Sequence, residues 1–471
     1  MTDAMQSKLQ RRTLLKTVPA AGLATLMRPE GSLGADAVRF AFFADPSEAL
    51  AYAQLIDRFE EVQTGIKIEP VVISSSNVAP LGRLLPASKY PEWLRGSFTG
   101  PNPPDAFLFT YRDVGAYETR GVLEPLDTWL SASRSLDEAD FYPEALSLFR
   151  PMNRPLLAIP QNLSSLVVYF NTEMFENAGL ADPTTGWTWE AFIAAASELT
   201  RDLDGDSFPE VHGVAFDPTI HRFAAAIWGA GGELFDDVYQ PTRLPLDTPE
   251  ARKGIECTTT LGPTGINATP TQADRLLLDD TQRFLRGQAA MLIQSRRVVA
   301  YLRDNAKVPW DVAPLPVGMI PANVSHSDGL GMWTGSPRKE GAWKFIEFAM
   351  SEEGQKILAE SGRTVPSMKR VAESDAFLKG GSAASLLGYT QSPRSASVFL
   401  DNIAISRPLP STTTWPSAVW EMDRAFKKAF YDDGNVEAAI TQVMDRTTFS
   451  NEGSQDLFEM ASPNRIPGTE D

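Results

Sequence analysis

The sequence has few of the residues on which disulfide-linked, metal-binding and redox proteins depend. Its 471 residues include one cysteine, Cys257, and three histidines, His212, His221 and His326, far apart in the chain. One cysteine cannot form an internal disulfide, and the histidines lack the spacing of metal ligands. Gly-x-Ser-x-Gly, His-Glu-x-x-His, P-loop and Cys-x-x-Cys motifs are also missing. We therefore expect no enzyme, no resident metal and no cofactor.

Long apolar runs and an excess of positive charge are missing as well. No segment approaches the ~20 consecutive apolar residues that cross a bilayer as a helix. The net charge is −17, which offers no electrostatic attraction to nucleic acid or to an anionic membrane. The sequence therefore argues against a nucleic-acid-binding protein and against membrane insertion.

The N-terminus carries the pattern of an export signal. In "QRRTLLKTVPAAGLATLM", residues 10–27, the run from Val18 to Met27 is apolar all round and, at roughly 15 Å as a helix, too short to cross a bilayer. Small residues follow it, and the sequence "RRTLLK" resembles the twin-arginine signal. We predict a signal peptide over residues 1–37, the alternative being a basic N-terminal helix of a cytosolic protein.

Export by this route places the mature chain in the periplasm. No cysteine stands directly after the predicted signal, so a lipid anchor of the bacterial lipoprotein type is not expected. Cleavage would remove five basic and three acidic residues and change the net charge from −17 to −19. A remaining chain of about 430 residues exceeds the ~250 to 300 residues that one core supports, so at least two domains are expected.

The order of predicted elements indicates α/β domains. "VRFAFFA" (residues 38–44) is typical of a buried strand, residues 46–62 form an amphipathic helical pattern, and "IKIEPVVI" is the next strand. This is a β-α-β unit, which predicts a mostly parallel sheet covered by helices. The buried strand "DAFLF" (residues 105–109) continues the pattern.

Two longer passages resemble one protein family. "LAIPQNLSSLVVYFNTEMFENAGL" with the following "WTWEAF", and "GLGMWTGSPRKEGAWKFIEFAMSEEGQKILAESGRTVP", are similar to segments of bacterial extracellular solute-binding proteins of the maltose-binding type. The chain departs from the family pattern at Phe170, where Tyr is usual, and at Arg297, where Trp is frequent.

The resemblance implies a two-lobed periplasmic binding protein fold, each lobe a mostly parallel sheet flanked by helices, with a ligand cleft between them. Lobe one would comprise residues 38–154 and 325–362, and lobe two residues 156–323 and 365–446, followed by a C-terminal tail over 447–471. The implied function is the periplasmic substrate-binding component of an ABC importer, a monomer that delivers a carbohydrate to a membrane permease. A secreted carbohydrate-active hydrolase or lyase, and a periplasmic ligand-sensing protein without a transporter, are the alternatives.

A sugar site requires flat aromatic rings for the sugar's C–H faces and planar polar groups for its hydroxyls. Lobe one offers residues at the ends of predicted strands, where ligands collect in open parallel sheets. Lobe two offers residues after Pro160, ahead of Trp228 and after "AAMLI", and Arg363 lies at the second crossing. The predicted ligand-binding residues are Asp45, Tyr111, Arg112, Asp113, Asn162, Ser164, His221, Arg222, Trp228, Gln294, Arg297, Arg363 and Trp420.

Several of these residues have a structural alternative. Trp420 and Trp228 either stack on ligand or belong to the core, and Trp415 competes with Trp420 for the stacking position. Asp45 and the Arg112-Asp113 pair are also typical of helix starts. The number of arginines allows an anionic ligand, although a neutral oligosaccharide or polyol is favoured.

The acidic stretch "DLDGD" (residues 202–206) has two interpretations. Clustered carboxylates suit calcium, but the glycine is the fourth residue rather than the sixth, and Gly213 stands where an EF-hand has a bidentate glutamate. A surface turn is therefore favoured over a calcium site.

Overall fold

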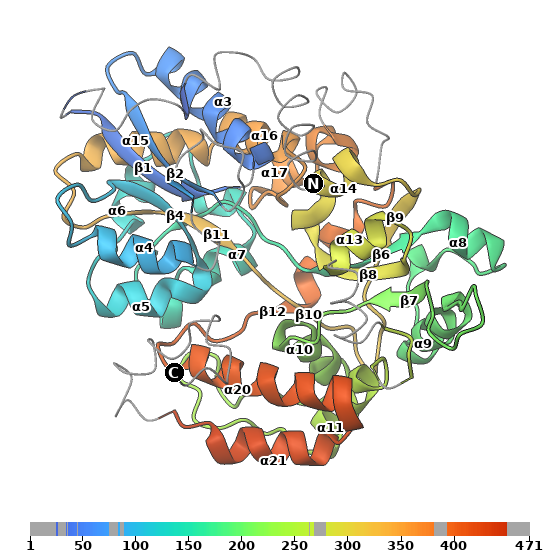
Figure 1. Ribbon diagram of the computed structural model, residues 1–471. Coiled ribbons are helices and arrows are strands. Elements are labelled where there is room, and N and C mark those ends of the chain that lie inside the picture. Colours follow the sequence, from blue (N-terminus) through green and yellow to red (C-terminus); the bar gives the residue numbers. More distant parts are fainter. Residues whose placement is uncertain are drawn as a thin grey trace, which may run out of the picture. The chain divides into compact units, whose positions relative to one another are not determined.

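The computed structural model describes residues 25–26, 34, 36–44, 46–74, 83–84, 89–262, 264–267, 279–380 and 393–449. The predicted signal peptide and C-terminal tail lie almost entirely outside these residues. Contacts divide the chain into two compact units (Figure 1). Unit 1 contains the chain up to Ser164, Arg296–Asp304 and His326–Ser392, and unit 2 contains Ser165–Ser295, Asn305–Ser325 and the chain from Pro393 onward.

Unit 1 is built on one six-stranded sheet. Its strands, in spatial order, are β3 (Arg83–Leu84), β2 (Ile68–Ser74), β1 (Val38–Phe43), β4 (Ala106–Thr110), β11 (Asp328–Met332) and β5 (Ile159–Pro160). Neighbouring strands are parallel except that β11 runs antiparallel to both β4 and β5. The predicted β-α-β unit is confirmed, because α3 (Pro46–Val62) connects the parallel strands β1 and β2.

Helices of unit 1 bury an aromatic core against this sheet. α15 (Lys339–Ala349) contacts β1, α3 and α16 (Glu352–Glu360), and these helices lie together in Figure 1. The ring of Phe345 on α15 lies 4.8 Å from that of Phe40 and 5.3 Å from that of Phe59. The other helices of unit 1 are α4 (Tyr90–Ser97), η2 (Tyr111–Asp113), α5 (Val114–Thr119), α6 (Asp127–Ala132), η3 (Glu138–Asp140), α7 (Pro143–Leu148), η4 (Pro151–Asn153), η6 (Arg296–Val298), α14 (Val299–Asn305), α17 (Lys369–Ala372) and η7 (Ala376–Gly380).

Unit 2 has a four-stranded sheet in the order β7 (His212–Ala215), β8 (Ala289–Ser295), β6 (Leu166–Asn171) and β9 (Trp310–Ala313). β7 and β8 are parallel, but β6 lies between β8 and β9 and runs antiparallel to both. The expectation of a mostly parallel sheet holds for unit 1 but not for unit 2. In unit 2 the central strand β6, which begins just after the chain leaves unit 1, runs antiparallel to both of its neighbours. A short parallel pair, β10 (Asn323–Val324) and β12 (Ser406–Arg407), completes the strands described in this unit.

Helices form most of the remaining core of unit 2. α10 (Ile220–Gly229) contacts α11 (Pro249–Thr259) and α20 (Trp415–Lys428), and α21 (Val436–Arg446) contacts both α11 and α20. Gly254 permits the close approach of α11 to α10, because a Cβ there would lie 2.5 Å from the Cα of Ile227. The other helices of this unit are α8 (Thr172–Asn177), η5 (Pro183–Thr185), α9 (Trp189–Leu199), α13 (Asp280–Leu285), α19 (Val398–Asp401), η8 (Ile403–Ile405) and η9 (Ala429–Asp433).

The unit boundaries differ from the predicted lobe boundaries in three places. Residues 156–164 and those that follow 365 pack in unit 1, because β5 pairs with β11 and the Leu163 amide donates to the Val365 carbonyl at 3.0 Å. The segment Arg296–Asp304 also belongs to unit 1. These short crossing segments have no local pattern that assigns them to one sheet or the other.

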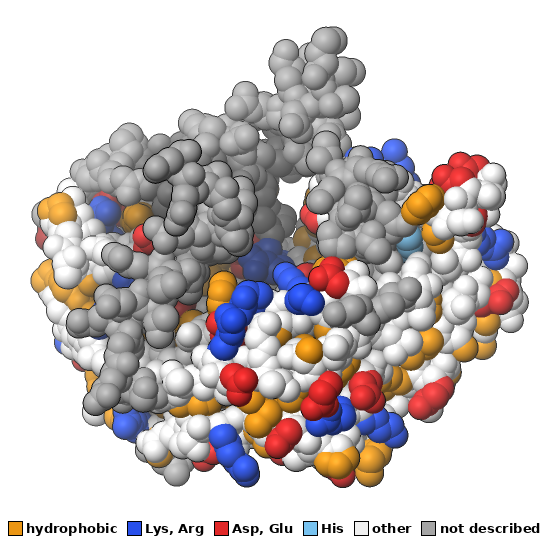
Figure 2. All heavy atoms as spheres, turned by 60° about the horizontal axis from the view of Figure 1, so that its bottom comes forward, with side chains coloured by type: hydrophobic (Ala, Val, Ile, Leu, Met, Phe, Trp, Pro, Cys, Tyr) orange, Lys and Arg blue, Asp and Glu red, His pale blue; other side chains and the backbone are white. Residues whose placement is uncertain are grey.

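The surface mixes acidic and basic side chains. Figure 2 shows both kinds interspersed on one face, with hydrophobic side chains scattered among them. Within the described ranges, none of the helices combines the length and apolar character needed to cross a membrane.

Candidate functional site

Three segments of unit 1 meet at one edge of its sheet. β4 and β5 end at this edge, and they continue into Tyr111 and Gln161 respectively. β11 begins at the same edge because it runs antiparallel, with Asp328 opposite Thr110 and Gly329 opposite Pro160. Polar residues after β4, after β5 and before β11 are therefore brought together, which the rule for open parallel sheets predicts.

Asp328 stands at the centre of this edge. Its Oδ1 lies 3.4 Å from Nε2 of His326, and its Oδ2 accepts from Nδ2 of Asn162 at 3.5 Å. The Asp328 amide donates to Oδ1 of Asn162 at 3.0 Å, and its carbonyl accepts from the Gln161 amide at 2.8 Å. The backbone of Asp328 is thus held on both sides, while 32% of its side chain remains exposed.

The electrostatic surroundings keep Asp328 ionised. Burial raises the pKa of this carboxyl, but the charge and hydrogen bond of His326 oppose it. The charge of Arg297 and the hydrogen bond from Asn162 lower the pKa further, to a value well below the usual range of aspartate. A carboxylate that stays charged is an acceptor only.

The residues after β4 surround Asp328 with mixed charge. Tyr111 is buried, and its ring meets the His326 ring edge-on at 6.0 Å between centroids. Arg112 is exposed, whereas Asp113 is half-buried at the start of α5. Burial raises the pKa of Asp113 to about 6, although the charges of Arg112 and Arg95 oppose this and Asp328 adds to it.

Arg363 forms a buried ion pair with the start of α3. Its Nε lies 2.7 Å from Oε2 of Glu48, in the first turn of α3, and both side chains are less than a tenth exposed. The hydroxyl of Tyr52, one turn further along α3, donates to the Gln161 side chain. This ion pair fastens α3 to Arg363 within unit 1, and the ligand-binding role of Arg363 stays a prediction.

Unit 2 has its own polar edge, where the parallel strands β7 and β8 end. Arg222 of α10 is buried here, and its Nε donates to the carbonyl of Ile293 on β8 at 3.2 Å. Its Nη1 lies 3.3 Å from Asp217 and 3.0 Å from the hydroxyl of Thr219. His221 beside it and Gln294 at the end of β8 are half-buried.

An aspartate of α20 fastens this edge from a distant part of the chain. Oδ1 of Asp423 accepts from the amide of Ile220, the first residue of α10, at 2.6 Å. Burial raises the pKa of Asp423 to about 6; the backbone hydrogen bond and the charge of Lys427 oppose the rise. α20 therefore lies beside the start of α10 in unit 2.

The tryptophans divide into core and surface residues. Trp228 is 1% exposed and Trp415 is 3% exposed, and Phe235 packs edge-on against both. The ring of Trp228 is enclosed in the core of unit 2, which favours the core alternative for this residue over stacking on ligand. Trp420, one turn before Asp423 on α20, is 47% exposed, with the Arg424 guanidinium 5.0 Å from its ring centroid. This exposure excludes the alternative that Trp420 is a core residue.

The predicted site residues group differently from the predicted lobes. Asn162, Ser164 and Arg297 were expected on lobe two but belong to unit 1. Ser164 pairs with His326 through its backbone, the two amide-to-carbonyl distances being 2.7 and 2.8 Å. Asp45 lies outside the described residues.

Sequence reasoning missed Asp328, His326 and Glu48. The short sequence "SHSD" directly before a glycine-rich strand was an available signal, because polar residues next to a buried strand lie at a sheet edge. That strand could not be known to run antiparallel to β4, and so the edge to which these residues belong was not evident.

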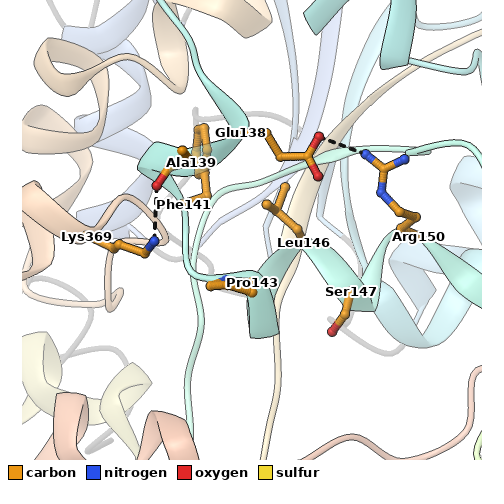
Figure 3. A pocket seen from close by; sticks show the side chains of 8 residues that line it. All are labelled: Glu138, Ala139, Phe141, Pro143, Leu146, Ser147, Arg150 and Lys369. Atoms are coloured by element: carbon orange, nitrogen blue, oxygen red, sulfur yellow. Dashed lines mark hydrogen bonds and ion pairs between the residues drawn. The ribbon is translucent and has the colours of Figure 1, made fainter. Parts of the chain in front are cut away.

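A pocket of about 340 Å³ lies elsewhere in unit 1, and Figure 3 shows its lining side chains. Its charged groups are already engaged: Nη2 of Arg150 lies 3.1 Å from Glu138, and Nζ of Lys369 donates to the Ala139 carbonyl at 3.1 Å. The other lining residues are Phe141, Pro143, Leu146 and Ser147. None of the predicted ligand-binding residues lines this pocket.

The acidic stretch after α9 folds as an exposed turn. Asp202 accepts from the amides of Gly205 and Ser207, at 2.7 and 2.8 Å, and Glu210 accepts from the Leu203 amide at 2.6 Å. Carboxylate oxygens of Asp202, Asp204, Asp206 and Glu210 lie within 4.8 Å of one another. The favoured surface turn is present, and its carboxylates accept hydrogen bonds from backbone amides of the same turn.

Comparison with known proteins places these features in a family. A sequence profile described as bacterial extracellular solute-binding protein matches residues 45–356. The galactooligosaccharide-binding protein of Bacillus subtilis is 22% identical over 306 residues, which cover 63% of this chain and 68% of that protein.

Two solved structures share the fold. An ABC substrate-binding protein from Listeria monocytogenes in complex with cycloalternan superposes with a TM-score of 0.73 at 21% identity, covering 87% of this chain and 97% of its own. UgpB from Mycobacterium tuberculosis in complex with glycerophosphocholine gives a TM-score of 0.71 at 19% identity, covering 91% and 99% respectively. The predicted two-lobed periplasmic binding protein fold is confirmed.

Proposed function

Since this chain belongs to the bacterial extracellular solute-binding protein family, we propose that it is the substrate-binding component of an ABC importer and that its ligand is a neutral carbohydrate. Two of the similar proteins are associated with different kinds of ligand. One is named for galactooligosaccharide, and another was solved with glycerophosphocholine, which carries a phosphodiester. The choice between them rests on how the arginines of this chain are used.

The observation that carries the proposal is that the arginines near the two sheet edges already face acceptors or acids. Arg222 donates to Ile293 and lies beside Asp217. Arg363 is paired with Glu48. Arg297 lies close enough to Asp328 to lower the pKa of that carboxyl.

Arg296 is buried as well and donates to the Gly362 carbonyl at 3.0 Å. Arg222, Arg297 and Arg363 face acids and therefore give little net attraction to an anionic ligand, whereas Arg296 is fully buried. Arg112 is exposed after β4, and its charge opposes the rise in the pKa of the neighbouring Asp113. A guanidinium suits a sugar diol as well as an acid. Together these contacts favour hydroxyl groups over carboxylate or phosphate.

Binding would proceed by capture and delivery without chemistry on the ligand. Each unit carries polar side chains at the carboxyl edge of its sheet, and a ligand that contacted both sets would favour the conformation in which both can reach it. Among the residues that the structure describes, no specific arrangement favours the hydrolase, lyase or transporter-free sensing alternatives. We further propose export to the periplasm by the twin-arginine route, with a membrane permease as the partner.

A thermal-shift screen tests the proposal. Maltotriose, raffinose, galactose, galacturonate and glycerophosphocholine would be added to the purified mature chain, because a bound ligand raises the melting temperature by mass action. We expect a neutral saccharide to raise the melting temperature. We also expect the same saccharide to be recovered chemically unchanged after incubation with the protein. A shift with galacturonate or glycerophosphocholine alone would refute the neutral-ligand proposal, and consumption of the sugar would refute a binding protein.

A further inference from the structure

We infer that Asp328 is a further ligand-binding residue, whose carboxylate accepts hydrogen bonds from ligand hydroxyls and disfavours carboxylate or phosphate groups at the same position. This inference rests on the proposed carbohydrate-binding function and adds to it the group that selects hydroxyls over anions. It does not involve Trp420 of unit 2.

The position of Asp328 is fixed by its backbone. The residue pairs with Thr110 of β4, its amide donates to Asn162 and its carbonyl accepts from Gln161. A binding group requires such support, because a carboxylate displaced by a fraction of an ångström loses the geometry of a hydrogen bond. The sheet therefore presents Asp328 in one place at the edge where β4 and β5 end.

The carboxylate itself retains capacity to accept. Two carboxylate oxygens offer about four acceptor positions. Here Oδ1 has one contact, at 3.4 Å to His326, and Oδ2 has one, at 3.5 Å from Asn162. Both contacts are at the long end of hydrogen-bond distances, and about a third of the side chain is exposed. Ligand hydroxyls can therefore add to these contacts without displacing a strong one.

The groups that act on the Asp328 carboxylate are hydrogen-bond donors or positive charges. Arg297 is exposed and lowers the pKa of Asp328, as do His326 and Asn162. The Asp328 carboxylate offsets the Arg297 charge, which reduces the attraction of this place for an anion. A hydroxyl can donate to Asp328 and accept from a neighbouring guanidinium, which is the pairing that a sugar diol makes.

The test uses the mature chain and isothermal titration with the neutral saccharide, among maltotriose, raffinose and galactose, that binds the wild type. Asp328→Asn keeps the shape and removes the charge and half of the acceptor capacity. Because a hydrogen bond to a charged group contributes more than a neutral one, we expect affinity for that saccharide to fall about 10- to 100-fold. Asp375→Asn, an exposed aspartate of the same unit paired with Lys379, is the matched control and should leave affinity unchanged.

A second readout separates a binding role from a structural one. Galacturonate should bind Asp328→Asn more tightly than wild type, because removal of the negative charge relieves repulsion, whereas a purely structural lesion would weaken every ligand. If Asp328→Asn does not fold, Asp328→Glu keeps the charge but shifts the carboxylate by one methylene, and should also bind the saccharide more weakly.

The outcomes are distinguishable from failure of the proposed function. Absence of binding by any neutral saccharide to wild type overturns the proposed function and this inference together. Saccharide binding by wild type with unchanged affinity in folded Asp328→Asn leaves the proposed function standing and overturns the role of Asp328.

Discussion

Trp420 offers the sharpest test of where unit 2 meets its ligand. The side chain is 47% exposed. For an indole of roughly 250 Å², this leaves on the order of 120 Å² that a sugar could cover, or about 3 kcal/mol at ~25 cal/mol per Å². Since a sugar ring stacks on only one face, we expect about 1 to 2 kcal/mol, and Trp420→Ala should weaken saccharide binding roughly 5- to 30-fold.

The cost of the same change to folding should be small. Surface substitutions away from special features usually change the free energy of unfolding by no more than about 0.5 kcal/mol, and loss of the Arg424 contact adds about 0.5 to 1 kcal/mol. A buried tryptophan would instead cost about 3 to 5 kcal/mol on replacement by alanine. Trp415→Ala, at the start of the same helix, should show this larger loss.

Titration calorimetry and urea unfolding on the same preparations measure both effects. Tyr239→Ala is the matched control, because Tyr239 is a similarly exposed aromatic residue of unit 2, at 41%. It should leave affinity and stability unchanged. If Trp420→Ala binds the saccharide as tightly as wild type, the stacking role is refuted and the exposed indole needs another explanation.

Four further outcomes are expected. Because the pKa of Asp113 is raised to about 6 in the folded chain, its protonation stabilises the fold, and this contribution, at most about 3 kcal/mol, should be lost as pH rises from about 4 to above 6. Asp113→Asn should flatten that part of the urea-unfolding free energy against pH, and an unchanged slope would contradict the assignment. Arg363→Met should cost about 3 to 5 kcal/mol in urea unfolding, because it leaves Glu48 buried without its partner. The double change of Glu48 and Arg363 to methionine should recover most of that loss; equal losses would argue against a buried pair. Replacing Arg11 and Arg12 with lysine should retain the protein in the cytoplasm, which cell fractionation measures, and normal periplasmic recovery would refute the twin-arginine route. Small-angle scattering should give a smaller radius of gyration with saturating saccharide than without it, and equal radii would argue against closure.

Local patterns in the sequence were sufficient for several features of the fold. The apolar run at residues 38–44 and the helical pattern that follows it became β1 and α3, and the parallel pairing of β1 with β2 followed from their connection. In α20, Asp423 and Trp420 lie outside the buried stripe that contains Met422 and Phe426. Periodicity along one helix reports which residues face the core, but it left Trp420 open between the core and the ligand, and its 47% exposure was decided by the tertiary structure.

The membership of the site was decided by contacts between distant parts of the chain. Asn162 meets Asp328 across 166 positions, and Asp423 meets Ile220 across 203. The burial of Trp228 was not evident from the sequence, because it depends on contacts with other segments, such as the ring of Phe235 and the Arg407 guanidinium 4.6 Å from its ring centroid. The sequence by itself determined the family, the α/β elements and the faces of its helices. Only the tertiary structure decided which polar residues share a sheet edge, because strand pairing joins segments whose separation along the chain leaves no local pattern.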